Sequence, residues 1–142
     1  MRSAGRLIRC PMVVATLLGG IAVVAIGRQL LAAPASFTET PLYRADLAEI
    51  DKREVIVSRL ETSAGWSHGR HYHAGHEIVY VLEGEGTLEI EGAPAQPLRR
   101  GMVAHVPPGR IHAGRNASRS AAFTFLLIRI HVKGEPMSVE LN

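Results

Sequence analysis

Four side chains near the middle of the sequence have the chemistry of a metal site. His71 and His73 are separated by one residue in a β-prone run, so strand alternation is expected to place both imidazoles on the same face. Glu77 follows after one tight turn, and His112 follows the rigid turn Pro107-Pro108-Gly109, which can return a neighbouring strand to the same place. Three imidazoles and one carboxylate, without sulfur, suit a first-row divalent metal and leave coordination positions open.

Other residues near this set have less specific patterns. His105 lies on the strand before the Pro-Pro-Gly turn, where it could project into a cavity as a catalytic acid or base, or pack in the core. Glu77 is a second catalytic candidate, as a labile ligand and base. His76 is compatible with a functional role or with plain polar surface at a turn. Arg59 or Arg129 could reach an anionic substrate if its side chain faced inward, but alternation alone does not assign the face.

Short strands are the elements expected to position these residues. From about residue 40 onward no stretch keeps apolar side chains at helical spacing, whereas short β-rich runs are broken by glycine and proline turns. Runs of this kind, spaced roughly 8 to 12 residues apart, predict a sandwich or barrel. We expect residues 34–41 to be at most a short tether, and we expect strands at residues 54–60, 71–73, 77–82, 86–90, 102–106, 111–113 and 121–132.

The spacing of these residues resembles the two sequence motifs of the cupin superfamily. The first motif reads Gly65-x5-His71-x-His73-x3-Glu77-x6-Gly84, and the second reads Gly101-x5-Pro107-x-Gly109-x2-His112-x3-Asn116. The 16 residues between them are typical of short bacterial members of that superfamily. The resemblance covers residues 65–116 and implies an all-β double-stranded β-helix, the jelly-roll or cupin barrel. It also implies that the metal ligands are His71, His73, Glu77 and His112, that the glycines serve turns, and that Asn116 is a structural cap.

The first 35 residues have the pattern of an export signal. Arg2, Arg6 and Arg9 precede an uncharged apolar run at residues 11–27, and Ala33-x-Ala35 offers a cleavage site. We therefore expect a signal helix in residues 1–35, acting as a signal peptide or membrane anchor, and a cupin barrel domain in residues 36–142. Without a twin-arginine pair, the Sec route to the periplasm or the medium is favoured. The alternative is an inner-membrane anchor formed by residues 11–27.

The formal net charge of +3 does not indicate a nucleic-acid partner. Four of the 16 basic residues lie in residues 1–35, which contain no Asp or Glu, so residues 36–142 hold 12 basic against 13 acidic side chains. We therefore expect no nucleic-acid binding, and membrane contact only through the N-terminal segment. The single cysteine, Cys10, also lies in that segment, which leaves the mature chain without thiol chemistry.

The implied metal does not define a reaction, because cupins host many functions. One hypothesis is a metal-dependent enzyme of dioxygenase or isomerase type acting on a small organic molecule, as in the similar quercetinase-like cupins, with Fe, Mn, Cu, Ni or Zn as cofactor. The alternative is a non-catalytic module that binds or senses a metal or small ligand. The run at residues 123–130 is apolar on both sides, which is compatible with a strand buried in the monomer or in a homodimer interface.

Overall fold

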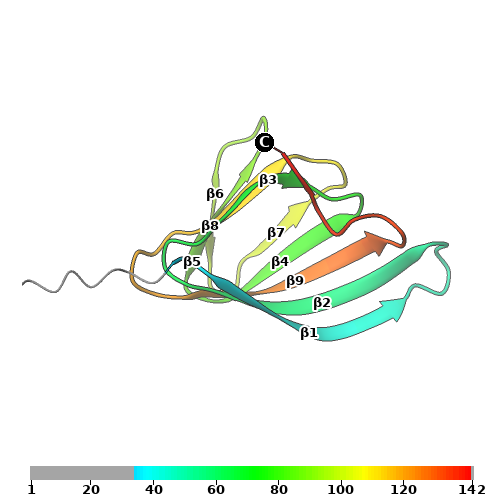
Figure 1. The fold of residues 1–142 in the computed structure, drawn as a ribbon, viewed down its shortest axis with the longest axis horizontal. Helices are drawn as coiled ribbons and strands as arrows, with labels where there is room; N and C mark the ends of the chain where they lie inside the picture. The colour runs from blue at the N-terminus through cyan, green and yellow to red at the C-terminus, as the bar shows by residue number, and fades with distance from the viewer. Residues whose placement is uncertain (1–33, 142) are drawn as a thin grey trace, which may run out of the picture. The chain divides into compact units, whose positions relative to one another are not determined.

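The computed structural model describes residues 34–141, which form ten strands in two antiparallel five-stranded sheets (Figure 1). One sheet has the order β1-β2-β9-β4-β7 and the other has the order β10-β3-β8-β5-β6. The strands are β1 (Phe37–Asp46), β2 (Arg53–Thr62), β3 (Ser67–Tyr72), β4 (His76–Glu83), β5 (Glu85–Ile90), β6 (Gln96–Arg99), β7 (Val103–Val106), β8 (His112–Asn116), β9 (Phe123–Val132) and β10 (Val139–Glu140). The expected all-β architecture is confirmed for this part of the chain.

Residues 34–141 contain no helix long and apolar enough to cross a membrane. The apolar run at residues 11–27, expected to form a signal or anchor helix, lies outside the described residues.

The core lies between the two sheets and follows from strand alternation. On β4 the side chains of Val79 and Val81 point inward, and on β9 those of Phe123, Phe125 and Leu127 do the same. These residues belong to one buried cluster with apolar side chains of β2, β5, β6 and β7. Glu77 precedes Val79 by two residues on β4, so the core face of this strand continues directly into the candidate metal site.

The expectation that residues 34–41 are a tether is wrong. Phe37–Asp46 is a ten-residue strand that pairs with β2 along its length, with a register shift between Pro41 and Tyr43. Two further strands, β6 and β10, were also not expected from the pattern. All three are edge strands, and β1 is exposed on both faces, so no buried side imposes a hydrophobic alternation on its sequence.

The turns and the cap implied by the two motifs are present. The motif glycines, Gly65, Gly84, Gly101 and Gly109, all have φ between +72° and +81°, a region that favours glycine. Asn116, at the end of β8, is buried and bridges the β2–β3 loop and the β8–β9 loop: its Nδ2 donates to Ser63 O at 3.0 Å and to Ala121 O at 2.9 Å. Its Oδ1 accepts from Ser118 N at 2.8 Å. The side chain of Asn116 therefore ties together loops that are distant in sequence.

We expect the substitution Asn116→Ala to destabilise the barrel by about 2 to 4 kcal/mol, because it removes these hydrogen bonds and leaves part-buried backbone groups without partners. Urea unfolding would measure the change. Ser120→Ala is the control, because Ser120 is exposed in the same loop region and should leave stability unchanged. Equal stability of the Asn116→Ala and wild-type proteins would contradict the capping role.

Candidate metal centre

The four candidate ligands come from both sheets and meet at one place. His71 on β3 lies directly opposite His112 on β8, and His73 follows β3 immediately. Glu77 enters from β4 in the other sheet. All four are buried, with exposed fractions of 3% to 7%. The expectation that His71 and His73 face the same side is confirmed, since their ring centroids lie 4.9 Å apart.

The imidazoles of this centre are all held in the same way. His71 Nδ1 donates to Gly69 O at 2.8 Å, His112 Nδ1 donates to Arg110 O at 2.9 Å, and His73 Nδ1 donates to Met137 O. A carbonyl can only accept, so each Nδ1 carries the proton and each Nε2 presents a lone pair when the ring is neutral. This is how metal-binding histidines are usually oriented by the groups around them.

The Nε2 atoms of His73 and His112 are buried and make no hydrogen bond. Glu77 is close to both, with Oε2 at 2.9 Å from His73 Nε2 and Oε1 at 3.5 Å from His112 Nε2, but neither contact has hydrogen-bond geometry. Buried polar atoms without partners are rare in folded proteins. The ligand atoms of the three histidines lie within 4.8 Å of one another, so this cluster can hold a metal ion.

The electrostatics of the centre favour a charged carboxylate among imidazoles. Burial would raise the pKa of Glu77, but His112, His73 and Arg129 outweigh it and hold that pKa well below its usual range. Burial lowers the pKa of His71 to about 4, so this imidazole is neutral at physiological pH. Burial would also lower the pKa of His73, but the Glu77 carboxylate reverses the direction and raises it. The site therefore combines a neutral imidazole with a carboxylate that stays ionised.

Arg129 on β9 faces inward and links the centre to the edge strand. Its Nε lies 3.4 Å from Glu77 Oε2, and its Nη1 lies 3.1 Å from Oε1 of Glu39 on β1. Strand alternation alone did not determine which face of β9 carries the side chain of Arg129. The pairing of Arg129 with Glu77 places that side chain on the inner face. Glu39 was not singled out from the sequence, because it lies on the strand taken for a tether.

His68 is a further site residue that the sequence pattern did not identify. It lies three residues before His71, so strict alternation would place the two side chains on opposite faces. A register shift between His68 and His71 puts both rings on the inner side, stacked with centroids 3.9 Å apart. His68 Nε2 lies 3.1 Å from Glu140 Oε1. Gly69, inside the strand, is the sequence signal that could have indicated this bulge.

His105 neither enters the centre nor packs in the core, so both interpretations of it are wrong. On β7, Ala104 and Val106 are buried, so His105 between them points outward and is exposed. Its Nε2 lies 2.9 Å from Nδ1 of His76, which is also exposed. The two histidines therefore form a pair on the outer face, away from the other four candidates.

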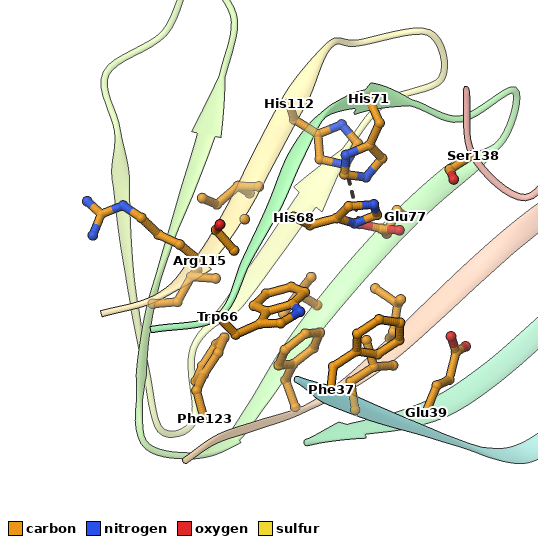
Figure 2. A pocket seen from close by; sticks show the side chains of 18 of the residues that line it. Phe37, Glu39, Trp66, His68, His71, Glu77, His112, Arg115, Phe123 and Ser138 are labelled. Carbon is orange, nitrogen blue, oxygen red and sulfur yellow. Dashed lines mark ion pairs between the residues drawn. The ribbon is translucent and has the colours of Figure 1, made fainter. Parts of the chain in front are cut away.

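A cavity of about 470 Å³ adjoins the centre. Figure 2 shows the imidazoles of His71, His112 and His68 gathered at one end and the rings of Trp66 and Phe37 at the other. The remaining wall is mostly apolar and is formed by side chains of β2, β4, β5, β6 and β9, including Leu60, Val79, Leu88, Leu98 and Phe125. The cavity can therefore hold a small molecule with one end at the histidines and its body against aromatic rings.

The C-terminal segment at residues 133–141, here called the C-terminal strap, completes the centre. Its Met137 carbonyl accepts the hydrogen bond from His73 Nδ1, and Met137 and Ser138 line the cavity. Farther along, β10 pairs with β3, and Leu141 N donates to Arg70 O at 2.8 Å. The strap thus supplies the group that orients one candidate ligand.

We expect a chain that ends at Glu135 to bind metal about 10 to 100 times more weakly, the range found when an orienting partner of a metal ligand is lost. Competition with a chelator would measure the affinity. Met137→Ala is the matched control, because it keeps the backbone carbonyl and should keep the affinity. An unchanged affinity in the shortened chain would show that the strap does not orient His73.

Comparisons with known proteins agree with this architecture. The profile of the Cupin domain family matches residues 58–129, a segment that contains all four candidate ligands. An uncharacterized protein from Aquifex aeolicus (strain VF5) is 33% identical over 72 residues, which make up 50% of this chain and 59% of that protein. The match therefore spans little more than half of that relative.

Two solved structures illustrate the likeness of fold. A cupin-like protein from Thermotoga maritima superposes with a TM-score of 0.61 at 24% identity, covering 75% of this chain and 79% of that one. The DMSP lyase DddQ from Ruegeria pomeroyi superposes with a TM-score of 0.54 at 28% identity, covering 61% of this chain and 42% of that one.

Proposed function

The chain belongs to the cupin superfamily, and from this premise we propose that it is a metal-dependent enzyme acting on a small organic molecule. The observation that carries the proposal is that the buried Nε2 atoms of His73 and His112 make no hydrogen bond, lie close to the Glu77 carboxylate and stand beside an apolar cavity. Their donor chemistry, with His71 and Glu77, fits a first-row divalent metal such as Fe, Mn, Cu, Ni or Zn. His71, His73, Glu77 and His112 would serve as the ligands of this metal.

The side chains around the centre have separable roles in this proposal. A bound metal would supply Lewis acidity toward a substrate oxygen and, if redox-active, the means to react with O2. Glu77, held ionised by its neighbours, would serve as an anionic ligand of the metal. The same neighbours make it a weak base, so accepting a proton from a substrate would require Glu77 to leave the metal and lose its contact with His73. Arg129 positions that carboxylate through its contact with Oε2. The apolar walls would favour the apolar body of a substrate over water.

The cavity favours a substrate with an apolar or aromatic body and an oxygen-bearing head. Trp66 and Phe37 stand where the body would lie, and the histidines stand where the head would lie (Figure 2). Enols, diketones and hydroxy acids combine these features. A dioxygenase or an isomerase would act on such molecules with the same residues.

A lyase is a second candidate reaction. It is favoured by the 28% identity to a DMSP lyase, although this chain covers only 42% of that protein. Lyase and isomerase reactions do not consume O2, whereas a dioxygenase does, so oxygen uptake separates the candidates.

The test uses protein purified from its native source without chelators and first analysed for its metal content. The metal-loaded protein is then offered flavonols, diketones, hydroxy acids and DMSP, with and without O2, while oxygen uptake and products are followed. We expect turnover of at least one compound, and its loss in the His112→Ala protein. Metal-loaded protein that binds but converts none of these compounds would instead indicate a non-catalytic binding module.

We also propose that the protein is exported through the Sec route to the periplasm or the medium. The proposal rests on the arginines before the uncharged run at residues 11–27 and on the small residues that follow it. N-terminal sequencing of protein from the exported fraction should find a chain that begins near Ser36. A membrane-bound chain with an intact N-terminus would indicate the anchor, and an intact Met1 in a soluble cytoplasmic pool would contradict export.

A further inference from the structure

Given the metal centre of the proposed function, on which this inference rests, we propose that His68 and Glu140 form an entry site that captures the metal ion and passes it to the buried centre through His71. Ligand atoms of these three residues lie within 4.8 Å of one another, so they make a second group in residues 34–141 that could hold a metal ion. Neither His68 nor Glu140 belongs to the four ligands of the centre.

The entry site and the centre differ in their access to water. The side chains of His68 and Glu140 are 41% and 54% exposed, whereas His71 and the other ligands of the centre are buried. His68 also lines the cavity, and its ring lies between those of His71 and Trp66 (Figure 2). Stripping a divalent cation of its hydration shell in a buried place is costly. An exposed imidazole and carboxylate can bind the cation while part of that shell remains.

His71 is the link between the entry site and the centre. Its Nδ1 donates to Gly69 O, so Nε2 is the one nitrogen of this ring with a lone pair for a metal. The same atom must therefore serve both groups. Zn–imidazole bonds are about 2.0 to 2.1 Å long, so two ion positions that share this nitrogen lie at most about 4.2 Å apart. An ion can cross that distance by exchanging its other ligands while it stays bound to His71.

Contacts between β3 and the C-terminal strap assemble the entry site. Glu140 lies opposite His71 in the pairing of β10 with β3. Its Oε1 lies 3.1 Å from Nε2 of His68 and accepts from Oγ of Ser138 at 2.9 Å. The rings of His68 and His71 stack with centroids 3.9 Å apart. An imidazole and a carboxylate are donors for the same first-row divalent metals that suit the centre, so one kind of ion can bind at both places.

Glu140 also supplies a negative charge where the cation would arrive. The arginines of β3 and β8, Arg70 and Arg115, have their own carboxylate partners in Glu91 and Glu89. Each of these pairs is neutral overall, so the charge of Glu140 is left to attract a cation. Attraction of this kind raises association rates by about 10 to 1000 times, and it weakens as salt screens the charge.

The test is the kinetics of Co(II) uptake by the metal-free full chain. Trp66 is the single tryptophan of the chain and lines the cavity, so quenching of its fluorescence in a stopped-flow instrument would report the arrival of this ion. Release would be followed after transfer to excess chelator, and the affinity by chelator competition at equilibrium. We expect His68→Gln to slow uptake and release by the same factor, at least about tenfold, with an unchanged affinity. A residue on the route changes both rates equally, whereas a permanent ligand changes the affinity.

The amide introduced by His68→Gln can still donate to Glu140, so the strap stays in place, but an amide is a poor replacement for an imidazole ligand. Glu140→Gln should also slow uptake, and its uptake rate should depend less on ionic strength than that of the wild type. Glu85→Gln is the matched control, because it removes the same charge from β5, where the side chain is 64% exposed and pairs with Arg99. It should leave both rates unchanged.

Wild-type uptake rates in both His68→Gln and Glu140→Gln would overturn the entry site and leave the buried centre intact. A weaker affinity with an unchanged uptake rate would also overturn the entry site, because His68 would then be a permanent ligand or a support of the strap. A wild-type chain that takes up no Co(II) would instead overturn the metal centre of the proposed function, and the entry site with it.

Discussion

The His112→Ala protein is expected to lose its metal. His112 Nε2 is buried without a hydrogen-bond partner beside Glu77, and its Nδ1 is already used on a backbone carbonyl. Loss of an orienting partner alone weakens metal binding by about 10 to 100 times, so loss of the ligand itself should weaken it by more than about 100 times. Metal content after gel filtration, and affinity by chelator competition, would measure this.

The matched control is His105→Ala, which removes an imidazole from the outer face of the neighbouring sheet. It should leave the metal content unchanged. A second readout is thermal stability: saturation of a site with ligand at about 100 times Kd stabilises the folded state by about 2.7 kcal/mol. That gain should be absent in His112→Ala. A His112→Ala protein that retains one metal per chain with wild-type affinity would disprove the site.

Gly84→Ala is expected to destabilise the fold strongly. Gly84 has a φ of +80° at the turn between β4 and β5, and an added Cβ would lie 2.4 Å from the carbonyl oxygen of Ala122 and 3.0 Å from Cα of Phe123. Both contacts are with backbone, so the hairpin or the start of β9 must move. The left-handed conformation costs about 1 to 2 kcal/mol, and the overpacking adds about 1 to 3 kcal/mol.

Gly101→Ala separates these two costs. Gly101 has nearly the same φ, +81°, but an added Cβ would meet nothing within 4 Å. Its substitution should therefore cost only the conformational part, about 1 to 2 kcal/mol. Urea midpoints of both variants, compared at equal m-value, would measure the difference. If both substitutions destabilised the fold equally, the close approach of the Ala122 carbonyl oxygen to Gly84 would not explain the effect of Gly84→Ala.

The residue pattern predicted the all-β class, and the resemblance of the two motifs to the cupin superfamily implied the barrel and the four residues of the candidate centre. Alternation in a short strand brings His71 and His73 to one face. The motif glycines around them all have a positive φ, as expected of glycines that serve turns. The edge strand β1 was not predictable in this way. Its side chains are exposed on both faces, so its sequence lacks the alternation that burial imposes.

Residues whose roles depend on pairing between distant strands could be placed only by the structure. Arg129 faces Glu77 because β9 pairs with β4 in one register, and a shift of one residue would have turned it outward. His68 joins the centre through a bulge, and His105 leaves it because Ala104 and Val106 occupy the inner side of β7.

The two motifs identified the set His71, His73, Glu77 and His112 and, through their resemblance to the cupin superfamily, implied the barrel. Local geometry accounts for the shared side of His71 and His73. The meeting of His112 and Glu77 with them depends on the pairing of β8 with β3 and on the packing of the two sheets. The packing of the two sheets decided what surrounds the set: Arg129, Glu39, the cavity and the C-terminal strap. It also decided which side of β9 faces the core, because burial on one side of a sheet is a property of the whole fold.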